Sequence, residues 1–244
     1  MALSSPLDTS SFTVVFDLDG TLVNTAPDLI AALNHTLRDA QFRTVPDMAV
    51  SELIGSGAKA MIKAGLKHQA ADVSETDLDA MFDVFLEHYL QNIAVESRPY
   101  DGCLSALDRL TDAGLTLAVC TNKKQNLAEE LLKTLDMHAR FSAIVGADSV
   151  PNRKPDPGHI QAAIKRSNGQ IDKAIMIGDS LSDERAAHAA GLPFLHCPFG
   201  YGPIDLHPAG HRTVLNKFDD LDVSFIRRSL DDYAATASRD VSEE

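Results

Sequence analysis

The 244 residues include 44% hydrophobic and 23% charged side chains, ordinary values for a globular protein with a large buried core. The 22 Lys and Arg residues are outnumbered by 35 Asp and Glu residues, and the formal net charge is −13. We therefore expect neither nucleic acid nor an anionic membrane as a partner, because both bind a basic face. No apolar run approaches the roughly 20 residues of a membrane span.

The cysteines and the first basic residue bear on the cellular compartment. Cys103, Cys120 and Cys197 are odd in number, far apart and without the spacing of metal ligands. Such thiols usually stay reduced, which favours the cytoplasm. No Lys or Arg precedes Arg38, so the basic segment that opens a secretory signal is missing. We expect a cytoplasmic protein.

Short apolar runs alternate with amphipathic stretches along most of the chain. In the amphipathic stretches leucines recur every three or four residues, for example at Leu104, Leu107 and Leu110, as on one face of a helix. The runs expected to form strands are Thr13–Phe16, Leu117–Cys120, Ala143–Val145, Ala174–Ile177 and Phe194–His196. Strands that alternate with helices usually pair in parallel. The sequence therefore predicts an α/β fold with a doubly wound parallel sheet, a Rossmann-like core with helices on both faces.

One region directly after the first strand interrupts this alternation. It contains no good strand run but several helical patterns. These patterns cover Leu29–Leu37, Val50–Leu66 and Leu78–Leu90. The segment Pro99–Gly102 is typical of a turn that returns the chain to the core. We predict a core domain of residues 1–23 and 99–244, whose last residues from about 231 fray, and an inserted α-helical domain of residues 24–98.

Two carboxylates, Asp17 and Asp19, stand one residue apart at the carboxyl end of the first expected strand. Holding both in a buried crevice is costly without a cation. Gly20 follows them and permits the tight turn that lets both point into the crevice above the sheet. An acidic β-turn without a chemical role has the same local pattern, so the rest of the chain must distinguish the two interpretations.

Three further groups of polar residues follow in order. Thr121 ends the second strand, Lys154 lies among prolines before a helix, and Asp179 and Asp183 follow the strand at 174–177. The four-residue spacing of the two carboxylates places both on one side of a starting helical turn. Hard oxygen ligands of this kind suit Mg²⁺. A helix N-cap at Ser180 or Asp179 explains the same pattern, and capping and metal binding can coexist.

Together, in this order, the four motifs resemble those of the haloacid dehalogenase-like hydrolases, a superfamily of aspartyl-phosphate phosphatases. The resemblance extends from about Phe12 to about Phe218. It implies that Asp17 is a nucleophile that forms an aspartyl phosphate. It also implies that Asp19 protonates the leaving alcohol and then activates water.

The same resemblance assigns roles to the second and third motifs. The Thr121 hydroxyl and the backbone N–H of Asn122 are expected to bind a phosphoryl oxygen. Lys154 is expected to neutralise the negative charge that develops between the nucleophile and the phosphoryl group. These residues complete the predicted catalytic set of Asp17, Asp19, Thr121 and Lys154.

A Mg²⁺ cofactor is implied as well. The predicted metal site consists of Asp17, Asp19, Asp179 and Asp183, with Asp19 contributing its backbone carbonyl. Asp179 is expected to be a direct ligand. Asp183 is expected to hold a metal-bound water or to orient Lys154.

Four shorter segments resemble the phosphoglycolate phosphatase branch of the superfamily. They are Gly20–Val23, Thr25–Leu29, Ile54–Lys59 and Phe199–Gly202. Asn24 departs from this branch, in which an Asp is common, and puts details of substrate or hinge in doubt. Thr21 stands where the related phosphomutases usually have an apolar residue, which favours hydrolysis over mutase chemistry.

The helical insertion is similar to the mobile cap of these enzymes, which largely sets the substrate. Gly55 and Gly57 let the cap backbone approach a ligand, and Lys59 is expected to contact the non-reacting end of a small anionic substrate. An exposed lysine on an ordinary inter-helix turn is the alternative. The predicted substrate-binding residues are Asn122, Lys59, Gly20 and Thr21.

The resulting hypothesis is a Mg²⁺-dependent phosphomonoester hydrolase, a monomer or homodimer, that acts on a small phosphorylated metabolite, with 2-phosphoglycolate as the first candidate. Sugar- or nucleotide-phosphate phosphatases, an inorganic pyrophosphatase and a phosphomutase stay open within the superfamily. A non-catalytic binding protein is the alternative from another class. Such a protein has no need for Asp17, Asp19, Thr121, Lys154 and Asp179 together.

Overall fold

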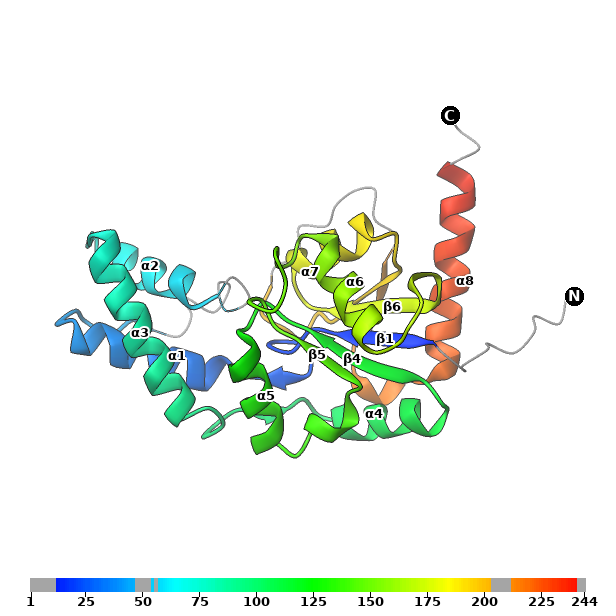
Figure 1. Ribbon diagram of the computed structural model, residues 1–244, viewed down its shortest axis with the longest axis horizontal. Coiled ribbons are helices and arrows are strands. Elements are labelled where there is room, and N and C mark those ends of the chain that lie inside the picture. Colours follow the sequence, from blue (N-terminus) through cyan, green and yellow to red (C-terminus); the bar gives the residue numbers. More distant parts are fainter. Residues whose placement is uncertain (1–11, 47–53, 55–56, 203–211, 241–244) are drawn as a thin grey trace, which may run out of the picture.

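The computed structural model of the protein describes residues 12–46, 54, 57–202 and 212–240. Within these residues the chain forms a six-stranded sheet flanked by helices, with a helical lobe at one end (Figure 1). The strands are β1 (Thr13–Phe16), β2 (Val23–Asn24), β3 (Arg98–Pro99), β4 (Thr116–Cys120), β5 (Ala143–Val145), β6 (Ala174–Gly178), β7 (Phe194–His196) and β8 (Arg212–Val214). The helices are α1 (Ala26–Asp39), α2 (Ala58–His68), α3 (Glu75–Gln91), α4 (Cys103–Asp112), α5 (Gln125–Thr134), α6 (Pro157–Arg166), α7 (Leu181–Ala189) and α8 (Val223–Asp240).

Strand β1 lies inside the sheet, whose order is β5-β4-β1-β6-β7-β8 with every neighbouring pair parallel. The chain runs from β1 to β4 and β5 on one side and then crosses to β6, β7 and β8 on the other. This reversal makes the carboxyl end of β1 a topological switch point, where open α/β sheets bind their ligands. Asp17, the residue after β1, is therefore placed in the crevice by the topology.

Helices cover both faces of the sheet, because successive residues of each strand face opposite sides. Val14 and Phe16 of β1 belong to one hydrophobic cluster, together with Leu107 of α4 and Leu131 of α5. Val15 belongs to a second cluster with apolar residues of α6 and α7. The prediction of a doubly wound α/β fold is confirmed.

All five predicted strands form, and two of them differ from the prediction by one residue. β4 begins earlier, at Thr116, and β6 ends later, at Gly178. Strand β8 and the antiparallel pair of β2 and β3 were not expected. Each has only two or three residues, too few to show a two-residue period in the sequence.

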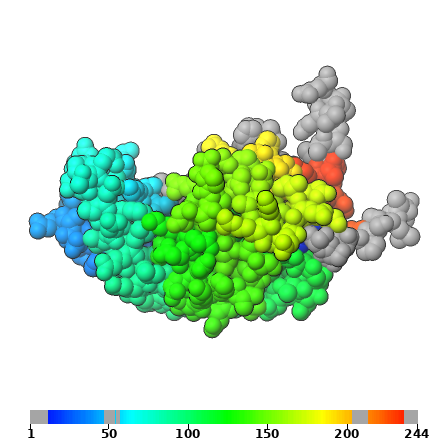
Figure 2. All heavy atoms as spheres, viewed as in Figure 1, coloured from blue at the N-terminus to red at the C-terminus, as the bar shows by residue number. Residues whose placement is uncertain are grey.

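Helices α1, α2 and α3 pack against one another and form the lobe, blue to cyan in Figure 1. In Figure 2 the lobe makes up one end of the molecule and adjoins the green atoms of the core. Buried residues of the lobe, such as Leu33 and Phe85, share one continuous cluster with the core. No helix among the described residues is long and apolar enough to cross a membrane.

The pair of β2 and β3 joins the lobe to the core. Val23 lies opposite Pro99 and Asn24 opposite Arg98, so the domain boundaries predicted after residues 23 and 98 cut through this pair. The division into two domains stays a prediction. Residues 231–240, expected to fray, continue α8.

Asp28 links the two segments that connect the lobe to the core. Its buried carboxylate accepts hydrogen bonds from the backbone N–H groups of Glu96, at 3.0 and 3.1 Å, and Ser97, at 2.8 Å, and from the Ser97 hydroxyl at 2.6 Å. Asp28 lies in the first turn of α1, whereas Glu96 and Ser97 lead back to β3. The chain entering the lobe and the chain leaving it are therefore held as a unit.

The helical pattern expected over Val50–Leu66 is wrong at Gly57. Helix α2 begins only at Ala58, and Gly57 before it has a φ of 96°, which L-amino acids rarely adopt. Residues 50–53, 55 and 56 of the pattern lie outside the described residues. The patterns at Leu29–Leu37 and Leu78–Leu90 do form helices, extended by a few residues at both ends as α1 and α3.

Candidate active site

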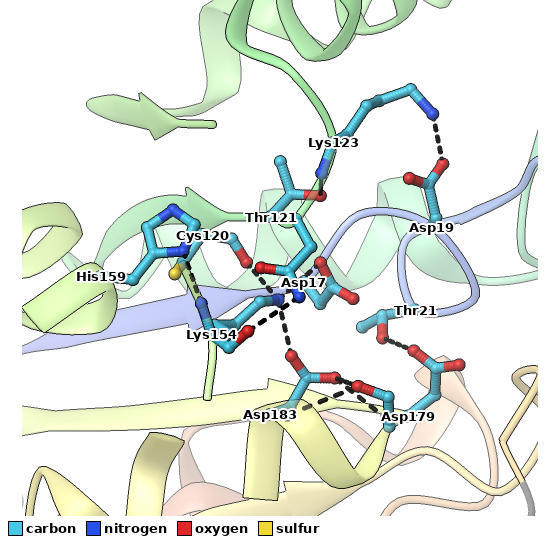
Figure 3. Close-up of polar contacts among 12 residues, drawn as sticks. Asp17, Asp19, Thr21, Cys120, Thr121, Lys123, Lys154, His159, Asp179 and Asp183 are labelled. Atoms are coloured by element: carbon cyan, nitrogen blue, oxygen red, sulfur yellow. Dashed lines mark hydrogen bonds and ion pairs between the residues drawn. The ribbon is translucent and has the colours of Figure 1, made fainter. Parts of the chain in front are cut away.

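Asp17 and Asp19 follow β1 closely, and Figure 3 shows Asp17 beside Lys154 and Asp19 beside Lys123. The backbone N–H of Asp17 donates to the carbonyl of Ile177 in β6 at 2.9 Å, so the sheet ladder holds this residue. Both residues are buried, since Asp17 is 6% exposed and Asp19 is 8% exposed. Gly20 adopts a φ of 84°, and a Cβ there would collide with the Asp179 carboxylate. Only glycine therefore fits this turn.

Lys154 connects the first and fourth motifs. Its Nζ lies 2.8 Å from Oδ1 of Asp17 and 2.6 Å from Oδ1 of Asp183, and it donates to the carbonyl of Cys120 at 2.7 Å. The Lys154 ammonium thus forms an ion pair with Asp17 and donates hydrogen bonds to Asp183 and Cys120. Burial alone would lower the pKa of Lys154, but the charges of Asp17 and Asp183 raise it. Lys154 is therefore held charged beside Asp17.

Asp179 approaches the same point from the end of β6. Its Oδ1 accepts from the Thr21 hydroxyl at 2.8 Å, and its Oδ2 accepts from the backbone N–H of Tyr201 at 2.9 Å. Carboxylate oxygens of Asp17, Asp179 and Asp183 all lie within 4.8 Å of one another. Thr21, expected to bind substrate, is fully buried and turned to Asp179.

Asp183 is engaged at both oxygens. Its Oδ1 contacts Lys154, and its Oδ2 accepts from the hydroxyl and the backbone N–H of Ser180, at 2.6 and 3.0 Å. With the return bond from the Asp183 N–H to the Ser180 hydroxyl, this is a capping box for α7. Asp183 thus contacts Lys154 directly, and its role toward Lys154 or a metal-bound water stays a prediction.

The protonation of the clustered carboxylates follows from their burial. Burial raises the pKa of Asp179 to about 8, and the charges of Asp17 and Asp183 add to the shift. Burial likewise raises the pKa of Asp17 to about 7, although Lys154 opposes it. Buried carboxylates this close together favour a proton or a cation. Three oxygen donors and this surplus of negative charge fit a divalent cation such as Mg²⁺.

Thr121 and Asn122 directly follow β4. The Thr121 hydroxyl accepts from the backbone N–H of Lys123 at 3.2 Å. The Asn122 side chain donates from Nδ2 to the carbonyl of Lys154 at 3.1 Å, and its buried Oδ1 has no partner among the described residues. Both residues line the same cavity as Asp17 and Asp19. The first three motifs therefore meet where the sequence places them.

Comparison with known proteins agrees with this geometry. Residues 14–197 match the family of haloacid dehalogenase-like hydrolases. The chain belongs to this family.

Similar proteins within the haloacid dehalogenase-like hydrolases indicate to which branch of the family the chain belongs. The phosphoglycolate phosphatases of Agrobacterium fabrum and Caulobacter vibrioides are 39% and 38% identical to it. These matches cover 91% and 90% of this chain, and 96% and 92% of the relatives. A crystal structure of a predicted phosphoglycolate phosphatase from Haemophilus somnus has a TM-score of 0.79 at 27% identity, over 88% of this chain and 97% of the other. The protein is a phosphatase of the phosphoglycolate phosphatase-like branch.

The sequence did not single out Lys123, a buried lysine of this hydrolase. Its Nζ lies 2.7 Å from Oδ1 of Asp19 (Figure 3). The same Nζ lies 4.6 Å from the ring centroid of Tyr89 in α3. Burial alone would lower the pKa of Lys123, but the charge of Asp19 raises it. The Thr25 hydroxyl donates to the same Asp19 oxygen at 2.7 Å. The only sequence signal was the place of Lys123 two residues after Thr121, which is equally typical of an exposed turn.

His159 of α6 is a second residue that the sequence did not reveal. Its Nδ1 accepts from the backbone N–H of Lys154 at 3.2 Å, and its Nε2 lies 3.1 Å from the carbonyl of Val145. These contacts suit the neutral ring that carries its proton on Nε2. Burial lowers the pKa of His159 to about 4, and the charge of Lys154 acts in the same direction. His159 therefore supports the backbone of Lys154 as a neutral side chain.

A cavity of about 540 Å³ lies between the site and the lobe. The core contributes Asp17, Asp19 and cationic side chains, and the lobe contributes apolar side chains together with Lys59 and Lys63. Lys59 of α2 is paired with Asp79 of α3 and lies 5.1 Å from the ring centroid of Phe82. Lys124 of the core approaches the same ring, at 5.0 Å. Lys59 thus faces the cavity, with a carboxylate partner of its own.

Proposed function

We propose that the protein is a Mg²⁺-dependent phosphomonoesterase in which Asp17 attacks phosphorus and forms an aspartyl phosphate. One observation carries the proposal: the Asp17 carboxylate stands at the switch point of the sheet with the Lys154 ammonium 2.8 Å away. A buried carboxylate needs such a cation to stay ionised, and only the ionised form is a nucleophile.

The carboxylates of Asp17 and Asp179 and the backbone carbonyl of Asp19 would hold the metal ion, with Asp183 behind Lys154. Their clustering and the raised pKa values of Asp17 and Asp179 support this assignment. When bound, Mg²⁺ would supply positive charge to the phosphoryl oxygens during transfer.

The remaining residues have separate roles around the phosphoryl group. Thr121 and Asn122 hold its oxygens, and Lys154 neutralises the charge that builds up beside Asp17. Asp19 gives a proton to the oxygen of the leaving alcohol as the P–O bond breaks. It then takes a proton from the water that attacks phosphorus and frees Asp17. Lys123 and Thr25 both contact Oδ1 of Asp19, which leaves Oδ2 for these proton transfers.

We propose 2-phosphoglycolate as the substrate. Relatives 38–39% identical over about nine tenths of the chain carry the name phosphoglycolate phosphatase. The cavity adds physical support, because Lys59, Lys124 and Arg153 line it in addition to the carboxylates. A substrate with phosphate at Asp17 and a carboxylate at its other end matches this distribution of charge.

The lobe is proposed to act as a cap that closes over the site. Water must be kept out while the aspartyl phosphate forms and admitted afterwards, and a hinged lid does both. The hinges are assigned to residues 23–25 and 98–102, where the pair of β2 and β3 joins lobe and core.

A panel of phosphate esters, assayed with Mg²⁺ and after EDTA treatment, tests the function. We expect the highest kcat/KM with 2-phosphoglycolate and loss of activity in EDTA. A preference for sugar phosphates, nucleotides or pyrophosphate would identify that class of compound as the substrate in place of 2-phosphoglycolate. Conversion of a hexose 1-phosphate to its 6-phosphate would indicate a mutase. No hydrolysis of any ester would contradict the proposal.

The intermediate needs its own test. Acid quenching during turnover of radiolabelled substrate should leave an acyl phosphate on the protein that hydroxylamine releases. The label should be missing from Asp17→Asn. Labelling of that variant to the wild-type level would exclude Asp17 as the nucleophile.

A further inference from the structure

We propose that Tyr201 is a positioning residue that couples the Asp179 carboxylate to the first hinge of the lobe. It belongs to the loop after β7, and its backbone and its hydroxyl contact two different parts of the protein. The inference rests on the proposed function, in which Asp179 holds the metal ion and the lobe closes over the site.

The backbone end of Tyr201 lies against Asp179. Its N–H donates to Oδ2 of Asp179 at 2.9 Å. Gly200 packs so closely that a Cβ there would collide with the same carboxylate, as it would at Gly20. The neighbouring Phe199 ring is held by Tyr100 and Phe218, with ring centroids 4.8 and 5.6 Å away. A shift of this loop therefore moves Asp179, because no free space separates the two.

The hydroxyl end of Tyr201 lies at the start of α1. It accepts hydrogen bonds from the backbone N–H groups of Thr25, at 2.5 Å, and Ala26, at 2.9 Å, and donates to Oδ1 of Asn24 at 2.9 Å. Helix α1 has no side-chain cap of its own, because the Thr25 hydroxyl is turned to Asp19. The Tyr201 hydroxyl thus supplies from the core the N-cap that α1 lacks.

Asn24 fits this arrangement. The Tyr201 oxygen accepts two hydrogen bonds and has one proton to donate, which the side-chain carbonyl of Asn24 receives. An Asp at position 24 offers the same acceptor and adds a negative charge. The departure from the phosphoglycolate phosphatase pattern at this position therefore leaves the contact with Tyr201 intact.

Coupling between two sites is reciprocal. If Tyr201 transmits the position of Asp179 to the hinge, binding of Mg²⁺ must alter the protection of the Thr25 and Ala26 amides. Removal of the hydroxyl must abolish this effect while the backbone bond to Asp179 is kept.

Hydrogen exchange of the whole protein, with and without Mg²⁺ alone, measures this coupling. In the wild type we expect Mg²⁺ to slow exchange in peptides covering residues 24–29. In Tyr201→Phe the Thr25 and Ala26 amides each lose one hydrogen bond, so the basal exchange of these two amides should rise about 2- to 13-fold, and Mg²⁺ should no longer slow it. Tyr233→Phe removes a hydroxyl from α8 and is the matched control, which should behave like the wild type.

Two variants at Asn24 separate coupling from general loosening. Asn24→Asp keeps the acceptor and should retain the Mg²⁺ effect, whereas Asn24→Ala should weaken it. With 2-phosphoglycolate, Tyr201→Phe should lower kcat more than it raises KM, because closure of the lobe follows binding. If Tyr201→Phe does not fold, the coupling is tested by the difference in the Mg²⁺ effect between Asn24→Asp and Asn24→Ala.

A Mg²⁺ effect on residues 24–29 that is equal in the wild type and Tyr201→Phe would overturn the coupling. The coupling would also be overturned if calorimetry shows that the wild type binds Mg²⁺ while the hydrogen exchange of residues 24–29 stays the same. A wild-type protein that neither binds Mg²⁺ nor hydrolyses phosphate esters would overturn the proposed function itself, so the two failures are distinguishable.

Discussion

Lys154 in the core and Lys59 in the lobe both form ion pairs near the site, but the first is buried and the second is exposed to water. The Lys154 side chain is 1% exposed and contacts groups from three separate segments of the core. The Lys59 side chain is 46% exposed, and its carboxylate partner comes from the neighbouring helix of the lobe. A buried charge depends on every partner, whereas a hydrated one exchanges partners at little cost. Lys154 therefore depends on its fixed partners in the core, whereas Lys59 can exchange Asp79 for another anion.

The sharpest test of the core is Asp17→Asn. An amide cannot attack phosphorus, so we expect kcat to fall by about 10⁴-fold or more while the fold is kept. Circular dichroism and a steady-state assay with 2-phosphoglycolate measure the two effects. A folded variant with the wild-type kcat would contradict the nucleophile assignment.

The two lysines can be compared directly through Lys154→Met and Lys59→Met. The first leaves Asp17 and Asp183 buried without their cation, and we expect a loss of about 3–5 kcal/mol in the free energy of unfolding. The second should hardly change it, because the charge of Asp79 stays in water. Urea unfolding in EDTA measures both. Equal losses would remove the distinction between core and lobe.

The pH dependence of stability tests the carboxylate cluster. In the metal-free folded protein burial raises the pKa of Asp17 to about 7 and the pKa of Asp179 to about 8, from 3.8 in the absence of burial. Between pH 4 and 8 the folded state therefore binds more protons than the unfolded state, and this contribution destabilises the protein as the pH rises. We expect the Tm in EDTA to fall from pH 5 to 8, and to fall less in Asp179→Asn. An identical slope in both proteins would contradict the raised pKa of Asp179.

The smallest effect is expected in the lobe, from Lys59→Ala. If Lys59 contacts the carboxylate of 2-phosphoglycolate, its loss should raise KM about fivefold or more for this substrate. The generic ester p-nitrophenyl phosphate offers no second anion, so its KM should change much less. Equal changes for the two substrates would mean that Lys59 does not recognise the substrate. The matched variant Lys67→Ala removes an exposed lysine of α2 that is not among the residues lining the cavity, and it controls for the charge of α2.

Part of the site could be predicted because its motifs are local in the sequence. Asp17, Thr121 and Asp179 each follow an apolar run, and parallel strands bring their carboxyl ends to one edge. The role of Lys59 stays a prediction, because its contact with a substrate depends on the position of the lobe. Lys123 and His159 escaped prediction, since nothing near them in the sequence distinguishes a buried cation or ring from an exposed one.

The sequence by itself determined five strands of the parallel sheet, the helical character of the segment after β1 and the chemistry offered at the ends of these strands, because short-range periodicity and residue type encode these features. Only the tertiary structure decided which groups pair: Lys154 with Asp17 and Asp183, Lys123 with Asp19, and Tyr201 with the start of α1. These contacts join segments 29 to 176 residues apart. They form because burial removes water as a competing partner, and burial is a property of the folded chain as a whole.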